Sequence, residues 1–190
     1  MTMPAPPLDD AARRELLLLA RQTLESYLAS GKIPEHETHR ESLRAHCGAF
    51  VSLHEGKRLR GCIGQIIADQ ELYKTVQRCA VSAAVEDYRF SRVESEELSG
   101  LTIEISVLTP MRRIRDVTQI EVGRHGLFIS CGVRRGLLLP QVAAQYGWDR
   151  ETFLIHTCRK AGLKDDEWRQ PSTAIHVFEA QVFSEEVAGH

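Results

Sequence analysis

Residues 49–63 read AFVSLHEGKRLRGCI, and this stretch indicates the fold class of the chain. Apolar and polar residues alternate on both sides of segment 55–57, which is the pattern of a β-hairpin with a loop of about three residues. In that register Ser52 pairs with Arg60, and both share a polar face with Cys62 because side chains alternate between the two faces. The other face is apolar and suits a core.

Outside this hairpin, helical and strand patterns alternate irregularly and hairpins dominate. This order predicts an α+β fold with mainly antiparallel sheets flanked by helices. Residues 1–7 carry three prolines and are expected to be a disordered lead, and residues 33–44 read as a loop. The expected elements are a helix capped by Asp9 or Asp10 and ended by Gly31, a helix capped by Asp69, a strand over 101–108, a hairpin over 126–139, a short helix from Pro140, a helix between Asp149 and Gly162, and a strand over 174–183.

Composition excludes several classes of protein. The 190 residues carry 24 Lys and Arg against 26 Asp and Glu, a formal charge of −2. This balance lacks the basic excess that is typical of nucleic-acid-binding proteins. No apolar run reaches the roughly 18 residues of a membrane span, and no signal-peptide layout is present, so the cytoplasm is the expected compartment. The five cysteines are widely spaced and form no C-x-x-C pair, so we expect no disulfide and no metal site.

Cys62 is the first candidate for chemistry because it lies between Gly61 and Gly64 and follows Arg60. Glycines allow a backbone or a ligand to approach closely, and a nearby arginine favours the reactive thiolate over the thiol. The alternative is structural, since free cysteines are often buried and behave as small hydrophobic residues.

Further motifs along the chain carry a resemblance to a known family. They are LRGCIG at 59–64, AA at 83–84 followed by DYRF at 87–90, IEISVL at 103–108, GRHGL at 123–127, LLPQVA at 138–143 and GW at 147–148. With these motifs the chain resembles the AMME-chromosomal-region (AMMECR) domain family, whose bacterial members are called AmmeMemoRadiSam system protein A. The resemblance runs from about residue 8 to residue 185, and Tyr88 departs from it where the family often has proline.

The resemblance implies a single domain over residues 8–190, built as two α+β lobes with a cleft between them. It assigns no reaction and no cofactor. The bacterial name implies two partners, a Memo-type protein and a radical S-adenosylmethionine enzyme, with which the chain would share a pathway or a complex.

Two functions from different classes remain open at this point. In the first, the chain is a binding module for a small anionic ligand, and the candidate ligand-binding residues are Arg60, Gly61, Gly64, Asp87, Arg89, Glu104 and Ser106. In the second, the chain is a thiol-dependent hydrolase or transferase, with Cys62 as the nucleophile, Arg60 or Arg89 lowering its pKa, and His125 as base or acid. In either case Cys62 is expected to face a cleft and to lie near at least one of these polar groups.

Each companion of Cys62 also has a structural interpretation. Asp87 and Arg89 can form an ion pair, Glu104 and Ser106 can face water on a half-exposed sheet, and His125 can cap a turn.

Overall fold

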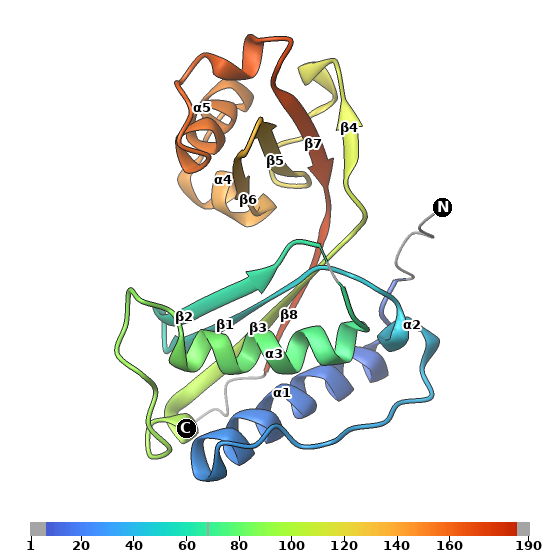
Figure 1. Cartoon of the computed structure of the whole chain (residues 1–190), viewed down its shortest axis with the longest axis vertical. Coiled ribbons are helices and arrows are strands. Elements are labelled where there is room, and N and C mark those ends of the chain that lie inside the picture. The colour runs from blue at the N-terminus through green and yellow to red at the C-terminus, as the bar shows by residue number, and fades with distance from the viewer. Residues whose placement is uncertain (1–6, 68, 186–190) are drawn as a thin grey trace. The chain divides into compact units, whose positions relative to one another are not determined.

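The computed structural model describes residues 7–67 and 69–185, and the chain divides into two compact units. The first unit holds residues up to 108 together with the segment from 181, and the second holds residues 109–180. Each unit is an antiparallel sheet with helices against it (Figure 1). The predicted α+β class with antiparallel sheets is therefore confirmed. Except for Pro7, the predicted disordered lead lies outside the described residues.

The first unit is a four-stranded sheet with the strand order β2-β1-β3-β8, which makes β2 an edge strand. Helices α1 and α3 pack against one face of this sheet (Figure 1). Its elements are α1 (Asp10–Ser30), α2 (Glu41–Arg44), β1 (Ala49–Glu55), β2 (Arg58–Gln65), α3 (Leu72–Val85), the 3₁₀ turn η1 (Leu98–Gly100), β3 (Leu101–Leu108) and β8 (Ala180–Ser184).

The ends of α1 follow directly from the sequence. The Asp9 side chain accepts a hydrogen bond from the backbone N–H of Ala12 at 2.7 Å, and Gly31 ends the helix at a φ of 72°. A positive φ at the C-cap is the conformation that glycine adopts without steric cost. The cap predicted for the next helix is wrong, because α3 begins after Glu71 and the Asp69 carboxylate instead accepts a hydrogen bond from Gln65.

The core of the first unit forms where the apolar face of the sheet meets α1 and α3. Alternate residues of β1 and β3 supply one side of this core, and the helices supply the other. The fully buried members include Leu16, Leu24, Val51, Leu53, Val76, Ile103 and Ile105.

The second unit is a four-stranded sheet with the order β4-β7-β5-β6, and its core packs against α5. Pro140 occupies the first turn of α4 and Asp149 caps α5, as predicted. Its elements are β4 (Arg112–Ile114), η2 (Val117–Gln119), β5 (Gly126–Cys131), β6 (Arg134–Leu138), α4 (Pro140–Tyr146), α5 (Arg150–Lys160), η3 (Glu167–Arg169) and β7 (Ala174–Phe178).

Two predicted segments differ from the structure. The strand predicted over 174–183 is two strands, β7 in the second sheet and β8 in the first. The predicted loop over 33–44 contains the single turn of α2. The chain enters and leaves the second unit at adjacent positions, because Thr109 N–H donates to Glu179 O at 2.9 Å and Glu179 N–H donates to Thr109 Oγ1 at 2.8 Å.

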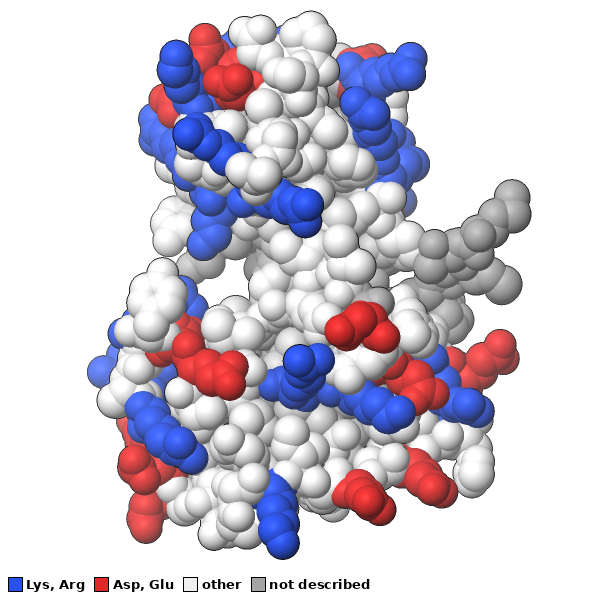
Figure 2. Space-filling view, viewed as in Figure 1, with Lys and Arg blue, Asp and Glu red and all other residues white. Residues whose placement is uncertain are grey.

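The surface carries charges of both signs. On the face drawn in Figure 2, basic and acidic side chains occur over each unit, as the near-balanced composition leads one to expect. Among the described helices, none has both the length and the apolar character needed to cross a bilayer.

Candidate functional site

The β1–β2 hairpin has a different register from the predicted one. Ser52 pairs with Cys62, not with Arg60, because the strands continue to a tight turn at Gly56 and Lys57. Gly56 has a φ of 59°, as such two-residue turns require. An irregularity beside Leu53 then leaves Arg60 as an extra residue on β2, and such a bulge redirects its side chain.

The corrected register gathers several candidate residues on the sheet face opposite the α1–α3 core. Cys62, Ser52 and Glu104 form one row across β2, β1 and β3. The next row along the strands contains Gly64, Phe50 and Ser106. The structure therefore brings Cys62, Glu104, Gly64 and Ser106 to one face of one sheet.

The Cys62 side chain is half-buried, and Ser52 Oγ donates a hydrogen bond to its sulfur at 3.1 Å. Burial is the largest influence on its titration and raises the pKa of the thiol. The Ser52 hydrogen bond and the Arg89 charge lower that pKa by less, whereas the Asp87 and Glu104 charges raise it further. Arg89 thus lowers the pKa of Cys62, as the thiol-enzyme hypothesis expects, but burial outweighs its charge, and Cys62 is a thiol at neutral pH.

Asp87 and Arg89 hold the backbone of Cys62 at the outer edge of β2. Asp87 Oδ2 accepts from the Cys62 N–H at 2.9 Å, and Arg89 Nη2 donates to the Cys62 carbonyl at 3.3 Å. Arg89 also binds Asp87 through Nε at 2.9 Å and Nη2 at 2.7 Å. These hydrogen bonds lower the pKa of Asp87 to about 2. The pair thus binds the outward N–H and C=O groups of this edge strand, which a neighbouring strand would otherwise bind.

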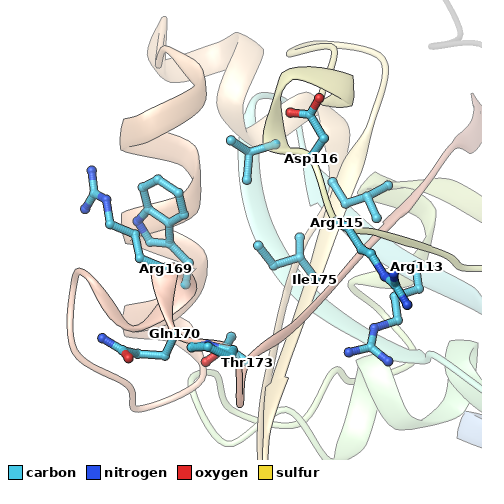
Figure 3. A pocket seen from close by; sticks show the side chains of 11 residues that line it. Arg113, Arg115, Asp116, Arg169, Gln170, Thr173 and Ile175 are labelled. Carbon is cyan, nitrogen blue, oxygen red and sulfur yellow. The ribbon is translucent and has the colours of Figure 1, made fainter.

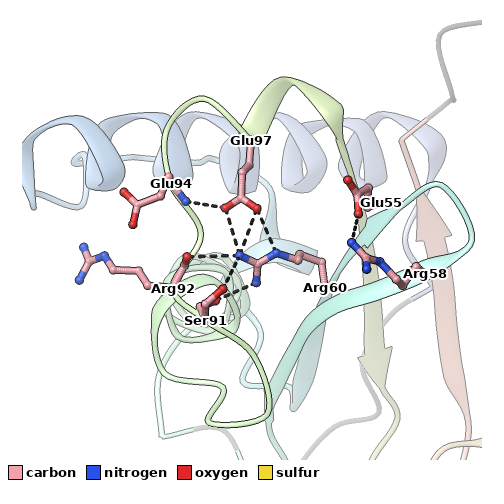
Figure 4. A network of polar contacts seen from close by, with 7 residues as sticks. All are labelled: Glu55, Arg58, Arg60, Ser91, Arg92, Glu94 and Glu97. Atoms are coloured by element: carbon pink, nitrogen blue, oxygen red, sulfur yellow. Dashed lines mark hydrogen bonds and ion pairs between the residues drawn. The ribbon is translucent and has the colours of Figure 1, made fainter.

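Arg60 is used inside the protein and does not accompany Cys62. Its guanidinium is buried and donates to the Ser91 carbonyl at 2.8 Å, to the Arg92 carbonyl at 3.2 Å and to Glu97 at 3.0 Å (Figure 4). The Glu97 carboxylate also accepts from the backbone N–H of Glu94. Arg60 therefore fixes the loop that leads from α3 to β3, and its predicted place on the Cys62 face is wrong because of the bulge.

Both glycines of the motif allow close contacts within the protein. A Cβ atom at Gly61 would lie 2.2 Å from the Ala83 carbonyl oxygen of α3. A Cβ atom at Gly64 would lie 2.2 Å from the Phe50 ring. The side of β2 at Gly61 is thus closed by α3, and a direct ligand contact through that side is not available.

His125 lies in the second unit and is buried. Its ring Nδ1 accepts from the backbone N–H of Glu121 at 3.1 Å, and the backbone N–H of His125 donates to the Glu121 carbonyl at 2.9 Å. This is the turn-capping role that the sequence left open as an alternative. A pairing of His125 with Cys62 stays a prediction.

A pocket that the sequence analysis missed adjoins the candidate residues. It has a volume of about 250 Å³ and lies between the free edge of β2 and α3. The available signal was the spacing of Arg78 and Ser82, which places them on one face of α3. The lining residues are Ile63, Gly64, Gln65, Asp69, Arg78, Cys79 and Ser82.

A larger pocket of about 630 Å³ lies in the second unit (Figure 3). Ile114, Ile175 and Trp168 contribute apolar surface, and Arg169 lies over the Trp168 ring at 4.1 Å. Arg169 is also paired with Glu151. Figure 3 shows the Arg113 and Arg115 side chains together on one side of the pocket, away from Arg169. No residue predicted for the site lines it.

All five cysteines are free. Across residues 7–67 and 69–185, no group of three His, Cys, Asp or Glu side chains is arranged to hold a metal ion.

Comparison with known proteins supports the assignment of the fold and the family. The AMMECR1 family profile matches residues 17–183. A protein of Thermococcus gammatolerans is 43% identical over 183 residues, covering 90% of this chain and 89% of that protein. A protein of Methanopyrus kandleri is 43% identical over 180 residues, covering 90% and 87%.

Among solved structures, an uncharacterised protein from Pyrococcus horikoshii superposes with a TM-score of 0.90 at 39% identity, covering 94% of each chain. This chain, with the motifs around Cys62 and its two antiparallel sheets, therefore belongs to the AMMECR1 family.

Proposed function

We propose that this protein binds a small anionic ligand beside Cys62, with Arg89 as the residue that recognises the negative charge. The observation that carries the proposal is the way Arg89 is held. Asp87 and the Cys62 carbonyl occupy Nε and Nη2, while the side chain remains 46% exposed. Among the described residues no hydrogen bond joins Nη1 to a partner. Because the bonds at Nε and Nη2 fix the guanidinium plane, the N–H groups of Nη1 are held in a fixed direction and are free to bind a ligand.

A guanidinium in a fixed orientation suits recognition of a carboxylate or phosphate. Arginine presents several N–H donors in one plane, and binding is strengthened when little side-chain freedom is lost. The neighbouring Cys62 thiol and Ser52 hydroxyl add uncharged polar atoms. Because Asp87 balances one positive charge, the ligand is bound mainly by directed hydrogen bonds, and its affinity should depend only modestly on salt.

The alternative, a thiol-dependent hydrolase or transferase with Cys62 as the nucleophile, has less support. A catalytic cysteine requires a thiolate, and burial raises the pKa of Cys62. The two functions separate in the pH dependence of Cys62 alkylation by iodoacetamide. A binding site predicts a rate that is still increasing above pH 8.5, whereas a nucleophile predicts a plateau well below pH 8.

Anion binding can be tested by NMR titration of the isotope-labelled protein with inorganic phosphate and with acetate. In the wild type we expect saturable shifts of the Arg89 Nε–H and the Cys62 amide, and in Arg89→Gln we expect the shift of the Cys62 amide to be lost. Arg92→Gln is the matched control, because Arg92 is an exposed arginine nearby in the chain whose side chain is not part of this cluster. Equal shifts in the two variants would contradict the proposal.

The proposed partners rest on the resemblance to AmmeMemoRadiSam system protein A, whereas the proposed cytoplasmic location rests on the sequence pattern described above. In this proposal the bound ligand is an intermediate shared with a Memo-type protein and a radical S-adenosylmethionine enzyme. Co-purification of the three proteins from one genome is the test. A complex, or transfer of a labelled ligand between them, would support the proposal, and lack of both would contradict it.

A further inference from the structure

The free edge of β2 continues beyond the Asp87–Arg89 pair. In an antiparallel pair, residues alternate between groups that bind the neighbouring strand and groups that point outward. The outward groups of Cys62 are those bound by Asp87 and Arg89. Two residues further along, the N–H and C=O of Gly64 point outward in the same way. Among the described residues, no side chain takes the place at Gly64 that Asp87 and Arg89 take at Cys62.

Gly64 opens into the 250 Å³ pocket against α3, and two polar side chains of that helix line the same pocket. The Arg78 side chain is 61% exposed and approaches the Asp69 carboxylate only to 4.0 Å. Within the described part of the chain, no hydrogen bond involves the Ser82 hydroxyl. The pocket therefore offers one backbone donor, one backbone acceptor, a hydroxyl and a weakly paired guanidinium.

This set of groups matches an amide followed by a carboxylate. A strand edge binds a secondary amide through one donor and one acceptor, and a guanidinium binds a carboxylate. A pocket of this size admits a molecule of only a few heavy atoms. We propose that the pocket binds an acylated amino-acid unit, with its amide on the Gly64 backbone and its carboxylate on Arg78.

The unit can come from a free N-acyl amino acid or from the C-terminus of a peptide, since both have the same chemistry. The site uses neither Arg89 nor the Cys62 thiol, so it stands independently of the function proposed above. Asp69 competes with the ligand carboxylate for Arg78. Removing the Asp69 charge should therefore strengthen ligand binding, whereas removing the Arg78 charge should weaken it.

The test is an NMR titration of the full chain with N-acetylglycine, observed at the Gly64 amide. N-acetylglycinamide lacks the carboxylate and acetate lacks the amide, and we expect each to bind at least about tenfold more weakly. Arg78→Gln should weaken N-acetylglycine binding about tenfold, and Asp69→Asn should strengthen it. Arg14→Gln, at an exposed arginine on α1, is the matched control and should bind like wild type.

Peptides that end in Gly-Gly identify the source of the ligand. Tighter binding than N-acetylglycine indicates a peptide C-terminus, and equal binding indicates a free N-acyl amino acid. The proposal is overturned if acetate reproduces the Gly64 shift, if Arg78→Gln binds like Arg14→Gln, or if no saturable shift occurs. Loss of phosphate binding in Arg89→Gln tests only the function proposed above, so the two proposals fail separately.

Discussion

The Ser52 hydroxyl donates a hydrogen bond to the Cys62 sulfur across the β1–β2 pair, with 3.1 Å between Oγ and Sγ. A hydroxyl donor stabilises a thiolate more than a thiol, so this contact lowers the pKa of Cys62 while burial raises it. Burial prevails, and the cysteine stays protonated at neutral pH.

Ser52→Ala should therefore raise the pKa of Cys62 further. The measurement is the alkylation rate of the Cys62 peptide with iodoacetamide, followed by mass spectrometry over a range of pH. We expect the midpoint of the rate profile to move to higher pH in the variant. A midpoint that is unchanged or lower would show that the hydroxyl does not act on the sulfur in solution.

Cys62→Ser should change the free energy of unfolding by less than about 1 kcal/mol, because the new hydroxyl faces Ser52 on a half-buried polar face. Cys47→Ser is the matched variant, since Cys47 is buried in the core of the same unit. An unpaired hydroxyl there should cost about 1–3 kcal/mol. The urea midpoints of the two variants measure these changes. A loss of stability in Cys62→Ser larger than about 1 kcal/mol would show that Cys62 serves mainly in packing.

Asp87→Asn should reduce stability at neutral pH by about 1–2 kcal/mol, because it removes the carboxylate that binds Arg89. Solvent partly screens the Arg89 side chain, which limits the cost to this range. The pKa of Asp87 is lowered from 3.8 to about 2, so its contribution is present above pH 4 and is lost as the pH falls through 2. Urea unfolding between pH 5 and pH 2 should be less pH-dependent in the variant than in wild type. Parallel curves would mean that the Asp87–Arg89 pair does not stabilise the fold.

Arg60→Ala should cost about 2 kcal/mol, because the Ser91 and Arg92 carbonyls lose their donor and Glu97 keeps only the Glu94 N–H. Arg58→Ala is the control on the same strand. Among residues 7–67 and 69–185, the partner of Arg58 is Glu55, and losing this exposed ion pair should cost less than about 1 kcal/mol. Denaturant unfolding compares the two variants, and equal costs would mean that the hydrogen bonds of Arg60 drawn in Figure 4 stabilise the fold only weakly.

Gly61→Ala should destabilise the protein by about 2 kcal/mol or more, since its Cβ would press on the backbone of α3 at Ala83. Gly100→Ala is a matched change, because a Cβ at Gly100 meets no atom within 4 Å. It should stay within about 1 kcal/mol of wild type. If thermal unfolding gives equal midpoints for the two variants, the close approach at Gly61 is not a packing constraint.

The sequence predicts the fold well where a local signal determines the structure. Gly31, Pro140 and Asp149 act at helix ends through their own backbone or side-chain chemistry, and each is found in its predicted place. Of the two aspartates that could cap the first helix, the structure uses Asp9. The division of 174–183 between two sheets could not be predicted, because an extended segment has the same pattern whichever sheet its halves join.

The candidate site was predicted less completely. Face alternation groups Cys62 with Ser52 in the hairpin and Glu104 with Ser106 in the strand over 101–108, and the structure has both pairs on one sheet face. The register error of two residues preserves the parity of Ser52 and Cys62. A bulge breaks that parity locally, which is why the prediction for Arg60 failed. The Asp87–Arg89 contact with Cys62 depends on how the loop after α3 returns to the sheet edge, and no pattern in the sequence records that path.

The joined entry and exit of the second unit bear on how the chain folds. β3 and β8 are neighbours in the first sheet, although the whole of residues 109–180 separates them. Closing so long a loop costs chain entropy before any strand contact can compensate. Once the second unit has folded, the hydrogen bonds between Thr109 and Glu179 hold the ends of that loop together. The arrival of β8 on β3 then becomes a short-range step, so we expect the inserted unit to fold before β8 joins the sheet.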